Sequence, residues 1–508
     1  MFAAIDGFRV WRRDGVLPRT CERLLVCAVL LLSLSGCGSK TAGGEESGDA
    51  STAAPILLIG IDGMEWDMAV PLLARGRLPN LAKLMERGSY GLLQSFRPTE
   101  SPVIWTSIAT GKVYSKHGIL HFVRRGPGGN VSLYSSSDRR TKALWNIVSD
   151  YHKRVCTIGW WMTYPVEPIN GVMVAQTNTA AQLDTRGGRA VWKGALMENV
   201  PGQVYPPQRQ AEMIAELEAV EQSLPELTHQ IFGEFRAPLS LLGERLWNNC
   251  LWAFQADATY ARITRRLLAE RPAFDLSMVY FGGPDVVGHR FWRYTYPDLY
   301  QYEPAPDQIQ NFGKVIEDYY AYIDRKVGDL LAASGPDTTV MVVSDHGMKP
   351  INLDVPFDAG NPPADVNSAH HKKAPPGIFV AAGPCIRRWE PGESVEDLRV
   401  EDLATVGSVY DITPTILALL RIPVGKDMDG HVLTGLIRDG FDLNDEPPPV
   451  VTHDTPEFLI SRPQVPRVAQ RDEERLRQLR ELGYITDEEP AKAADQKPTE
   501  PNDVGTKP

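Results

Sequence analysis

At 508 residues and a formal net charge of −11, the chain is long enough to form one large α/β domain or two domains. The excess of acidic residues argues against binding to a nucleic-acid polymer, because such proteins present a basic surface. A metal enzyme that acts on small anions is compatible with this charge, since bound cations supply positive charge locally.

The N-terminus predicts export. An arginine-bearing start leads into the apolar stretch Leu24–Leu32, which is too short to span a membrane and fits the core of a signal peptide. The stretch ends in Leu-Ser-Gly followed by Cys37, which is similar to the lipobox of bacterial lipoproteins. We therefore expect residues 1–36 to be a signal peptide, Cys37 to carry lipid, and residues 37–54 to form a flexible tether. The protein would then lie in the periplasm or at the cell surface, and Gly38 favours the outer membrane; a plain signal peptide with a chance cysteine is the alternative.

Three cysteines follow Cys37, namely Cys156, Cys250 and Cys385. Their odd number and wide spacing do not indicate a disulfide framework or a cysteine-based zinc ribbon. A single bridge among them is left open.

Short apolar runs that alternate with helical patterns predict an α/β fold with a central, mostly parallel sheet sandwiched by helices. In such sheets, ligands bind beyond the carboxyl ends of the strands. The expected strands are Ile56–Ile61, Val155–Gly159, Leu276–Phe281, Thr338–Val343 and Ile378–Ala382, and the expected helices are Pro79–Arg87, Val103–Thr110, Thr141–Ser149 and Thr413–Leu420.

The pattern also predicts how the chain is divided. Residues 55–161 and 275–435 are expected to form the catalytic domain, and polar amphipathic helices between them predict a helical insert over the active site at 162–274. Residues 436–485 are expected to form an extension with a charged helix at Arg467–Gly483. The polar, proline-bearing tail 486–508 is expected to be disordered.

Three aspartates each follow a predicted strand: Asp62, Asp285 and Asp345. His289 stands four residues after Asp285, in a segment whose proline and glycine suit a tight loop, and His346 directly follows Asp345. Carboxylate and imidazole groups from distant loops are what a two-metal hydrolase needs. Each signal alone also fits a turn or a solvated loop, but together they predict a metal site at one edge of the sheet.

Two further histidines, His370 and His371, precede the last predicted strand, and one of them could complete the site. The candidate nucleophile is Ser101, which Pro102 follows as in a helix N-cap with proline at the first helical position. A helix start also attracts phosphate, so a hydroxyl there is well placed to attack phosphorus. Thr99 is the alternative hydroxyl.

Several motifs follow one another along the chain: IDGM (61–64), TESPVIWTSIATG (99–111) with KHGI (116–119), GPDVVGH (283–289), VSDHGM (343–348) and a histidine before PPGIFVAAGP (375–384). In this order they resemble the type I phosphodiesterase and nucleotide pyrophosphatase family, which is part of the alkaline phosphatase superfamily. The resemblance covers about residues 55–435. It implies an alkaline-phosphatase-like fold with two zinc ions at the sheet edge. It also implies a phosphoseryl intermediate and a small-molecule phosphoester substrate.

Transferred position by position, the resemblance implies that one zinc ion is held by Asp62, Asp345 and His346 beside the nucleophile, and the other by Asp285, His289 and His371. His371 is preferred because it stands third after Ser368, as in the family's Ser-Gly-x-His form. Ser101 stands ten residues before Gly111, where the family places its nucleophile.

One position departs from the family. An asparagine that contacts a phosphate oxygen in nucleotide pyrophosphatases is replaced by Ile104. Lys112 or a backbone N–H is a candidate substitute for it. This departure weakens the assignment to nucleotide diesters in particular.

Four other functions are alternatives to a phosphodiesterase. A sulfatase requires a Cys/Ser-x-Pro-x-Arg signature, which the residues after Ser101 do not match, and the substrates of a cofactor-independent phosphoglycerate mutase are cytoplasmic. A phosphotransferase acting on lipid or glycan head groups is favoured by export and by the aromatic run Phe291–Tyr296. A non-catalytic surface-binding lipoprotein is the alternative from another class, and the presence of every expected ligand argues against it.

Overall fold

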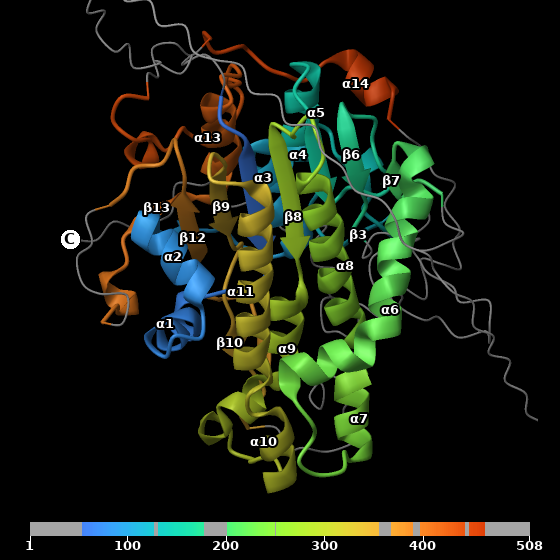
Figure 1. The fold of residues 1–508 in the computed structure, drawn as a ribbon, viewed down its shortest axis with the longest axis vertical. Coiled ribbons are helices and arrows are strands. Elements are labelled where there is room, and N and C mark those ends of the chain that lie inside the picture. Colours follow the sequence, from blue (N-terminus) through green and yellow to red (C-terminus); the bar gives the residue numbers. More distant parts are fainter. Residues whose placement is uncertain are drawn as a thin grey trace, which may run out of the picture. The chain divides into compact units, whose positions relative to one another are not determined.

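The computed structural model describes residues 53–125, 131–176, 201–248, 250–354, 367–389, 397–441 and 447–462, and these described residues belong to one compact unit. Its centre is a nine-stranded sheet with the order β13-β2-β12-β9-β1-β8-β5-β6-β7 (Figure 1). The bounds of these strands are β1 Ile56–Ile61, β2 Gly88–Gln94, β5 Val155–Ile158, β6 Gly171–Val174, β7 Val204–Tyr205, β8 Leu276–Phe281, β9 Thr339–Val343, β12 Gly377–Ala382 and β13 Thr405–Ser408.

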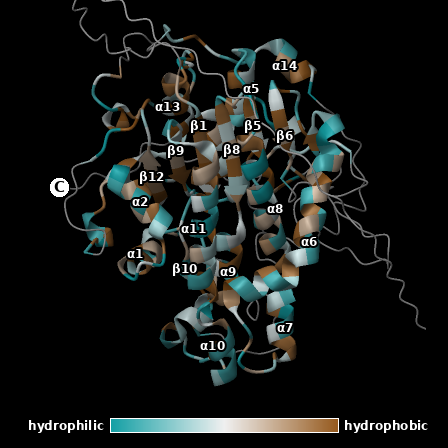
Figure 2. Ribbon diagram, viewed as in Figure 1, coloured by the Kyte–Doolittle hydropathy of each residue, from teal (hydrophilic) through white to brown (hydrophobic). Residues whose placement is uncertain are grey.

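The middle of the sheet consists of strands that are buried on both faces. β1 lies between β8 and β9 and pairs in parallel with both. All six residues of β1 and of β8 are buried, which explains why their sequences are continuous apolar runs without polar alternation. Figure 2 shows these hydrophobic strands in the interior, with hydrophilic residues gathered on the outer sides of the helices.

Helices cover both faces of the sheet and create two hydrophobic cores. Leu57 and Ile59 of β1 point into the first core, with α1, α2 and α6 to α11, whereas Ile56 and Leu58 point into the second, with α3, α5 and α13. Figure 1 shows α8 and α11 alongside the central strands and α9 continuing beyond the end of β8. The bounds are α1 Trp66–Ala74, α2 Pro79–Arg87, α3 Ser101–Thr110, α4 Tyr114–His117, α5 Leu144–Asp150, α6 Gln210–Phe232, α7 Leu241–Asn248, α8 Leu251–Leu268, α9 Gly283–Thr295, α10 Pro306–Phe312, α11 Val315–Ser334, α13 Ile412–Leu419 and α14 Pro456–Ile460.

The α/β fold class with a central, mostly parallel sheet is confirmed, and all five predicted strands are present within one residue of their expected bounds. The sheet is nevertheless mixed, because β12 runs antiparallel to both β9 and β2. β2 and β13 were not predicted. β13 has only four residues, and both sequences contain glycine and serine, which weaken the strand signal.

The segment 162–274 is not purely helical, which corrects the expectation of a helical insert. β6 and β7 lie within it and extend the sheet beyond β5. α8, from the same segment, packs against β8 and belongs to the first core. The prediction failed because two short strands of four and two residues leave little period-two pattern to detect.

Several predictions fall outside the described residues: the signal peptide, lipidation at Cys37, the tether, the charged helix Arg467–Gly483 and the disordered tail. No described helix is both long enough and apolar enough to cross a membrane. Cys156, Cys250 and Cys385 are buried free thiols.

Candidate active site

The sheet order brings three of the predicted segments to one edge. Ile61 at the end of β1 pairs with Phe281 at the end of β8, and Gly60 pairs with Val343 at the end of β9. The chain segments that leave these three parallel strands therefore start side by side. Asp62 continues the ladder with one more bond, in which its N–H donates to the carbonyl oxygen of Phe281 at 2.9 Å.

Asp62, Asp345 and His346 form one buried group. Their potential ligand atoms all lie within 4.8 Å of one another, and each residue is at most 1% exposed. His346 Nε2 lies 3.2 Å from Asp345 Oδ2 and 3.5 Å from Asp62 Oδ1. The structure thus brings together the three residues expected around the first ion.

Asp285 and His289 lie in the first two turns of α9, not in a tight loop as the sequence suggested. Pro284 is tolerated there because the start of a helix does not need its N–H. The i, i+4 spacing places both side chains on one face, with His289 Nε2 at 3.4 Å from Asp285 Oδ1. α9 therefore presents a carboxylate and an imidazole to the same point.

Two histidines are held by main-chain carbonyl oxygens. Nδ1 of His289 lies 2.8 Å from Ala369 O, and Nδ1 of His346 lies 3.1 Å from Gly347 O. A carbonyl oxygen only accepts, so Nδ1 carries a proton in both rings. Nε2 is therefore the nitrogen through which each ring can bind a metal ion.

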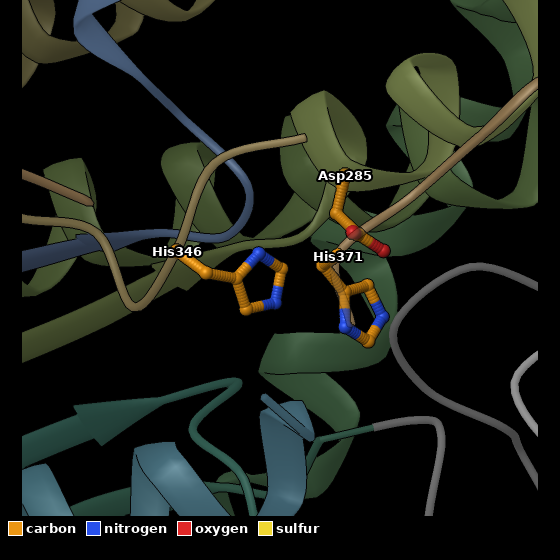
Figure 3. A group of neighbouring side chains, drawn as sticks. All are labelled: Asp285, His346 and His371. Carbon is orange, nitrogen blue, oxygen red and sulfur yellow. The ribbon is translucent and has the colours of Figure 1, made fainter. Parts of the chain in front are cut away.

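Between the two candidate histidines, the structure places His371 in the site. It forms a second group with Asp285 and His346, whose potential ligand atoms also lie within 4.8 Å of one another (Figure 3). Its ring centroid is 5.1 Å from that of His289. His370 is half-buried, and its Nδ1 accepts a hydrogen bond from the N–H of Lys372 at 2.8 Å.

Burial and mutual repulsion dominate the electrostatics of the site. Burial, reinforced by the charge of Asp285, raises the pKa of Asp62 to about 7, and burial together with Asp62 raises the pKa of Asp345 well above its usual range. Burial also acts to raise the pKa of Asp285, but the interaction with His289 outweighs it and lowers that pKa. Burial lowers the pKa of His346 to about 4 and the pKa of His371 well below its usual range.

These residues fit divalent cations. Asp345 Oδ2 and His346 Nε2 are buried and make no hydrogen bond in the structure, which is costly unless another partner satisfies them. Three buried carboxylates that repel one another are stabilised by positive charge, which neutral histidines do not supply. A mixed set of carboxylates and neutral imidazoles suits zinc among common metals.

Ser101 is the first residue of α3, one position inside the helix, because Glu100 is the N-cap. Its Oγ lies 3.5 Å from Asp62 Oδ1, so the hydroxyl borders the first group. The hydroxyl of Thr99 instead donates to the main-chain oxygen of His371. The geometry therefore favours Ser101 over Thr99 as the hydroxyl beside the ligands.

Lys112, the side chain that was a candidate to replace the missing asparagine, does not reach the site. Ile104 is fully buried in the second core. Lys112 follows the other end of α3, about 15 Å along a ten-residue helix, and its Nζ lies 2.6 Å from both Asp427 and Asp454. Lys112 is therefore a structural ion-pair residue.

Sequence reasoning missed the residues that hold the ligand loops. Ser344 Oγ accepts from the N–H of Met64 at 3.0 Å, and Glu65 Oε2 accepts from the N–H of Met348 at 2.9 Å, which ties the loop after β1 to the loop after β9. Trp105 and Tyr280 both donate to Asp62. In the sequence they are a tryptophan one helical turn after Ser101 and a tyrosine inside an apolar strand, and both residue types fit ordinary core packing equally well.

The fold and the buried cluster define an α/β protein with a candidate metal centre at the carboxyl ends of its central strands, and comparison with known families gives the class of reaction. The family model for type I phosphodiesterase / nucleotide pyrophosphatase matches residues 56–406. The chain belongs to this family.

Individual relatives are distant. A 2,3-bisphosphoglycerate-independent phosphoglycerate mutase from Nostoc sp. is 27% identical over 195 residues, which is 38% of this chain and 30% of that protein. The chain thus spans less than a third of that relative. Murine ectonucleotide pyrophosphatase/phosphodiesterase 5 in complex with AMP aligns with a TM-score of 0.43 and 12% identity, covering 76% of this chain and 100% of that one. A 2-O GAG sulfatase aligns with a TM-score of 0.43 and 13% identity, over 75% and 73% of the two chains.

Proposed function

We propose that this phosphoesterase is an exported, lipid-anchored enzyme that hydrolyses phosphodiester or nucleotide pyrophosphate bonds of small molecules at a two-zinc site, with Ser101 as nucleophile. The single observation that carries the proposal is the convergence of the buried carboxylates and histidines at the sheet edge, with the hydroxyl of Ser101 at 3.5 Å from Asp62. Family membership supports the reaction class.

The residues divide into two ligand sets around the nucleophile. Asp62, Asp345 and His346 would hold one ion, and Asp285, His289 and His371 the other. When bound, the two ions would neutralise the charge that develops on the phosphoryl oxygens and lower the pKa of bound oxygen nucleophiles.

The chain's own contribution begins with Ser101. Its Oγ would form the new bond to phosphorus while the bond to the leaving oxygen breaks, which gives a phosphoseryl intermediate that water then hydrolyses. The start of α3 favours the negative charge of the phosphoryl group through the helix dipole. The burial of the ligand residues lowers the local dielectric response, so each charge–charge interaction is stronger than in water.

An activity panel with metal analysis of the same preparation tests the proposal. It compares an aryl phosphodiester with the corresponding phosphomonoester, phosphonate and sulfate. Preferred turnover of the diester together with about two zinc ions per chain supports the proposal. Preference for the sulfate, or a preparation that is inactive and holds no zinc, contradicts it.

A further inference from the structure

The two oxygens of the Asp62 carboxylate have different surroundings. Oδ2 accepts hydrogen bonds from the Tyr280 hydroxyl at 2.6 Å and from Trp105 Nε1 at 3.0 Å. Oδ1 instead faces the site, at 3.5 Å from both Ser101 Oγ and His346 Nε2. The carboxylate is therefore oriented by two donors on the side away from the other ligand residues.

The two donors are themselves built into the core. The rings of Trp105 and Tyr280 meet edge to face, with centroids 5.2 Å apart, and both residues are buried. The indole of Trp105 lies against β1, where a Cβ on Gly60 would come within 2.6 Å of it. Trp160 packs against the other side of the Trp105 indole, and the two rings meet edge to face with their centroids 5.1 Å apart. Nε1 of Trp160 also donates a hydrogen bond to the main-chain oxygen of Trp105 at 3.2 Å. A glycine is thus required in β1 for the indole to reach the aspartate.

We infer that Trp105 and Tyr280 are positioning residues that hold Asp62 with Oδ1 directed at the metal ions, an inference that rests on the proposed two-metal function. Hydrogen-bond partners of ligating carboxylates orient them and typically change metal affinity by about 10–100-fold. Trp105 also stands one helical turn after Ser101, so the same face of α3 places the nucleophile at Oδ1 and a donor at Oδ2. The helix that carries the nucleophile thereby aligns the ligand beside it.

The test removes each hydrogen-bond donor and keeps an aromatic side chain at both positions. Tyr280→Phe and Trp105→Phe are each stripped of metal with a chelator, and zinc affinity is measured by competition with a zinc-binding dye. We expect the affinity to fall about 10–100-fold in each variant. The activity at limiting zinc should fall with the affinity and recover in part as zinc is added.

Trp145→Phe is the matched control. Nε1 of the buried Trp145 also donates to a carboxylate, Glu167 Oε2, at 2.9 Å, but this carboxylate belongs to an ion pair with Arg139 and to neither metal-ligand group. The control loses the same kind of hydrogen bond and should keep the wild-type zinc affinity. Thermal unfolding of all variants reports the loss of stability, and Tyr280→Phe, which removes only one hydroxyl, carries the test if Trp105→Phe does not fold.

The outcomes are distinguishable. Unchanged zinc affinity in Tyr280→Phe, in a wild-type background that binds zinc, overturns the inference alone. An equal loss of affinity in Trp145→Phe also overturns it, because the effect is then one of general stability. A wild-type protein that binds no zinc contradicts the proposed function and the inference with it.

Discussion

The imidazole rings of His346 and His371 stack with their centroids 4.3 Å apart and their planes 20° apart. Burial lowers the pKa of both, so both rings are neutral at pH 7, which is the form that binds a metal ion. Asp285 joins the pair, so His346 belongs to both groups of potential ligands. The two ligand groups are therefore adjacent, and the site is a single cluster with Ser101 at its border.

The first prediction concerns the nucleophile. Ser101→Ala should reduce turnover of an aryl phosphodiester by a factor on the order of 10⁴ or more, since removal of a nucleophile eliminates the covalent route. Zinc content should stay close to that of the wild type, because six other ligand candidates remain. Thr99→Val is the comparison, and a loss within about tenfold is expected because one hydrogen bond to the main chain disappears. Near-normal activity of Ser101→Ala would assign the reaction to another group.

The second prediction separates the two histidines. His371→Ala should lower the zinc content and reduce activity by more than about 100-fold, since the loss of an outer-shell partner alone typically costs 10–100-fold. His370→Ala should retain both the zinc content and most of the activity, because that side chain is half-buried and bonds to the N–H of Lys372. Metal analysis and kinetics on both variants provide the check. The opposite ranking would exchange the two assignments.

The third prediction concerns the start of α9. Both oxygens of the buried Asp257 accept hydrogen bonds, from the N–H groups of Gly282 and Gly283 at 2.9 Å and from the Tyr319 hydroxyl at 2.9 Å. Asp257→Ala would leave these donors buried without their acceptor, so the free energy of unfolding should fall by about 1–3 kcal/mol or more. Chemical denaturation measures the change.

A surface aspartate supplies the control for that experiment. Asp329 lies in an exposed i, i+3 pair with Lys326 on α11, and its substitution by alanine should change the free energy of unfolding by at most about 1 kcal/mol. An equally small effect of Asp257→Ala would show that α9 does not depend on this contact.

The fourth prediction is a pH dependence of stability. His117 is fully buried, its Nε2 lies 3.0 Å from Ser107 Oγ, and burial together with the charge of Arg139 lowers its pKa to about 3. His117 binds a proton below about pH 6.5 in the unfolded chain but not in the folded chain. The free energy of unfolding therefore keeps its full value above that pH and falls as the pH drops toward 3. His117→Gln should remove this contribution, which amounts to at most about 1.4 kcal/mol per pH unit.

The comparison is made on the metal-free forms of both proteins, so that protonation of the ligand residues contributes equally. The difference in unfolding free energy between wild type and His117→Gln should change in favour of the variant from pH 7 to pH 5. Parallel pH profiles would show that folding does not lower the pKa of His117.

The fifth prediction concerns the anchor. Cys37→Ser should release the exported protein from the membrane fraction, because no acyl chain can then be attached there. Cys27→Ser changes a cysteine inside the expected signal peptide and should leave membrane association intact. Cell fractionation followed by detergent extraction distinguishes them. Membrane association of the Cys37→Ser protein would exclude the lipoprotein assignment.

The sequence predicted the centre of the fold well because its signals are local and strong. Continuous apolar runs identified β1, β8 and β9, and an aspartate of the site stands within four residues of the end of each run. The weak strands at the margins, β2, β6, β7 and β13, gave no such signal. Their positions depend on pairing with neighbours distant in sequence, which periodicity does not reveal.

The candidate ligands could also be predicted, but their support could not. Asp62, Asp345 and His346 were visible because metal-binding residue types follow strands in a recognisable order. Asp257 and Tyr280 were not, because an aspartate within a helix and a tyrosine within a strand have many other uses. Only the three-dimensional packing shows that each contacts a segment carrying a ligand residue.

The two strands contributed by residues 162–274 have a consequence for engineering. A chimera that exchanged this segment as a module would expose the edge of β5 and strip α8, with its Asp257, from the beginning of α9. The geometry of Asp285 and His289 would then change as well. Grafts that leave β6, β7 and α8 in place keep both the sheet and the start of α9 intact.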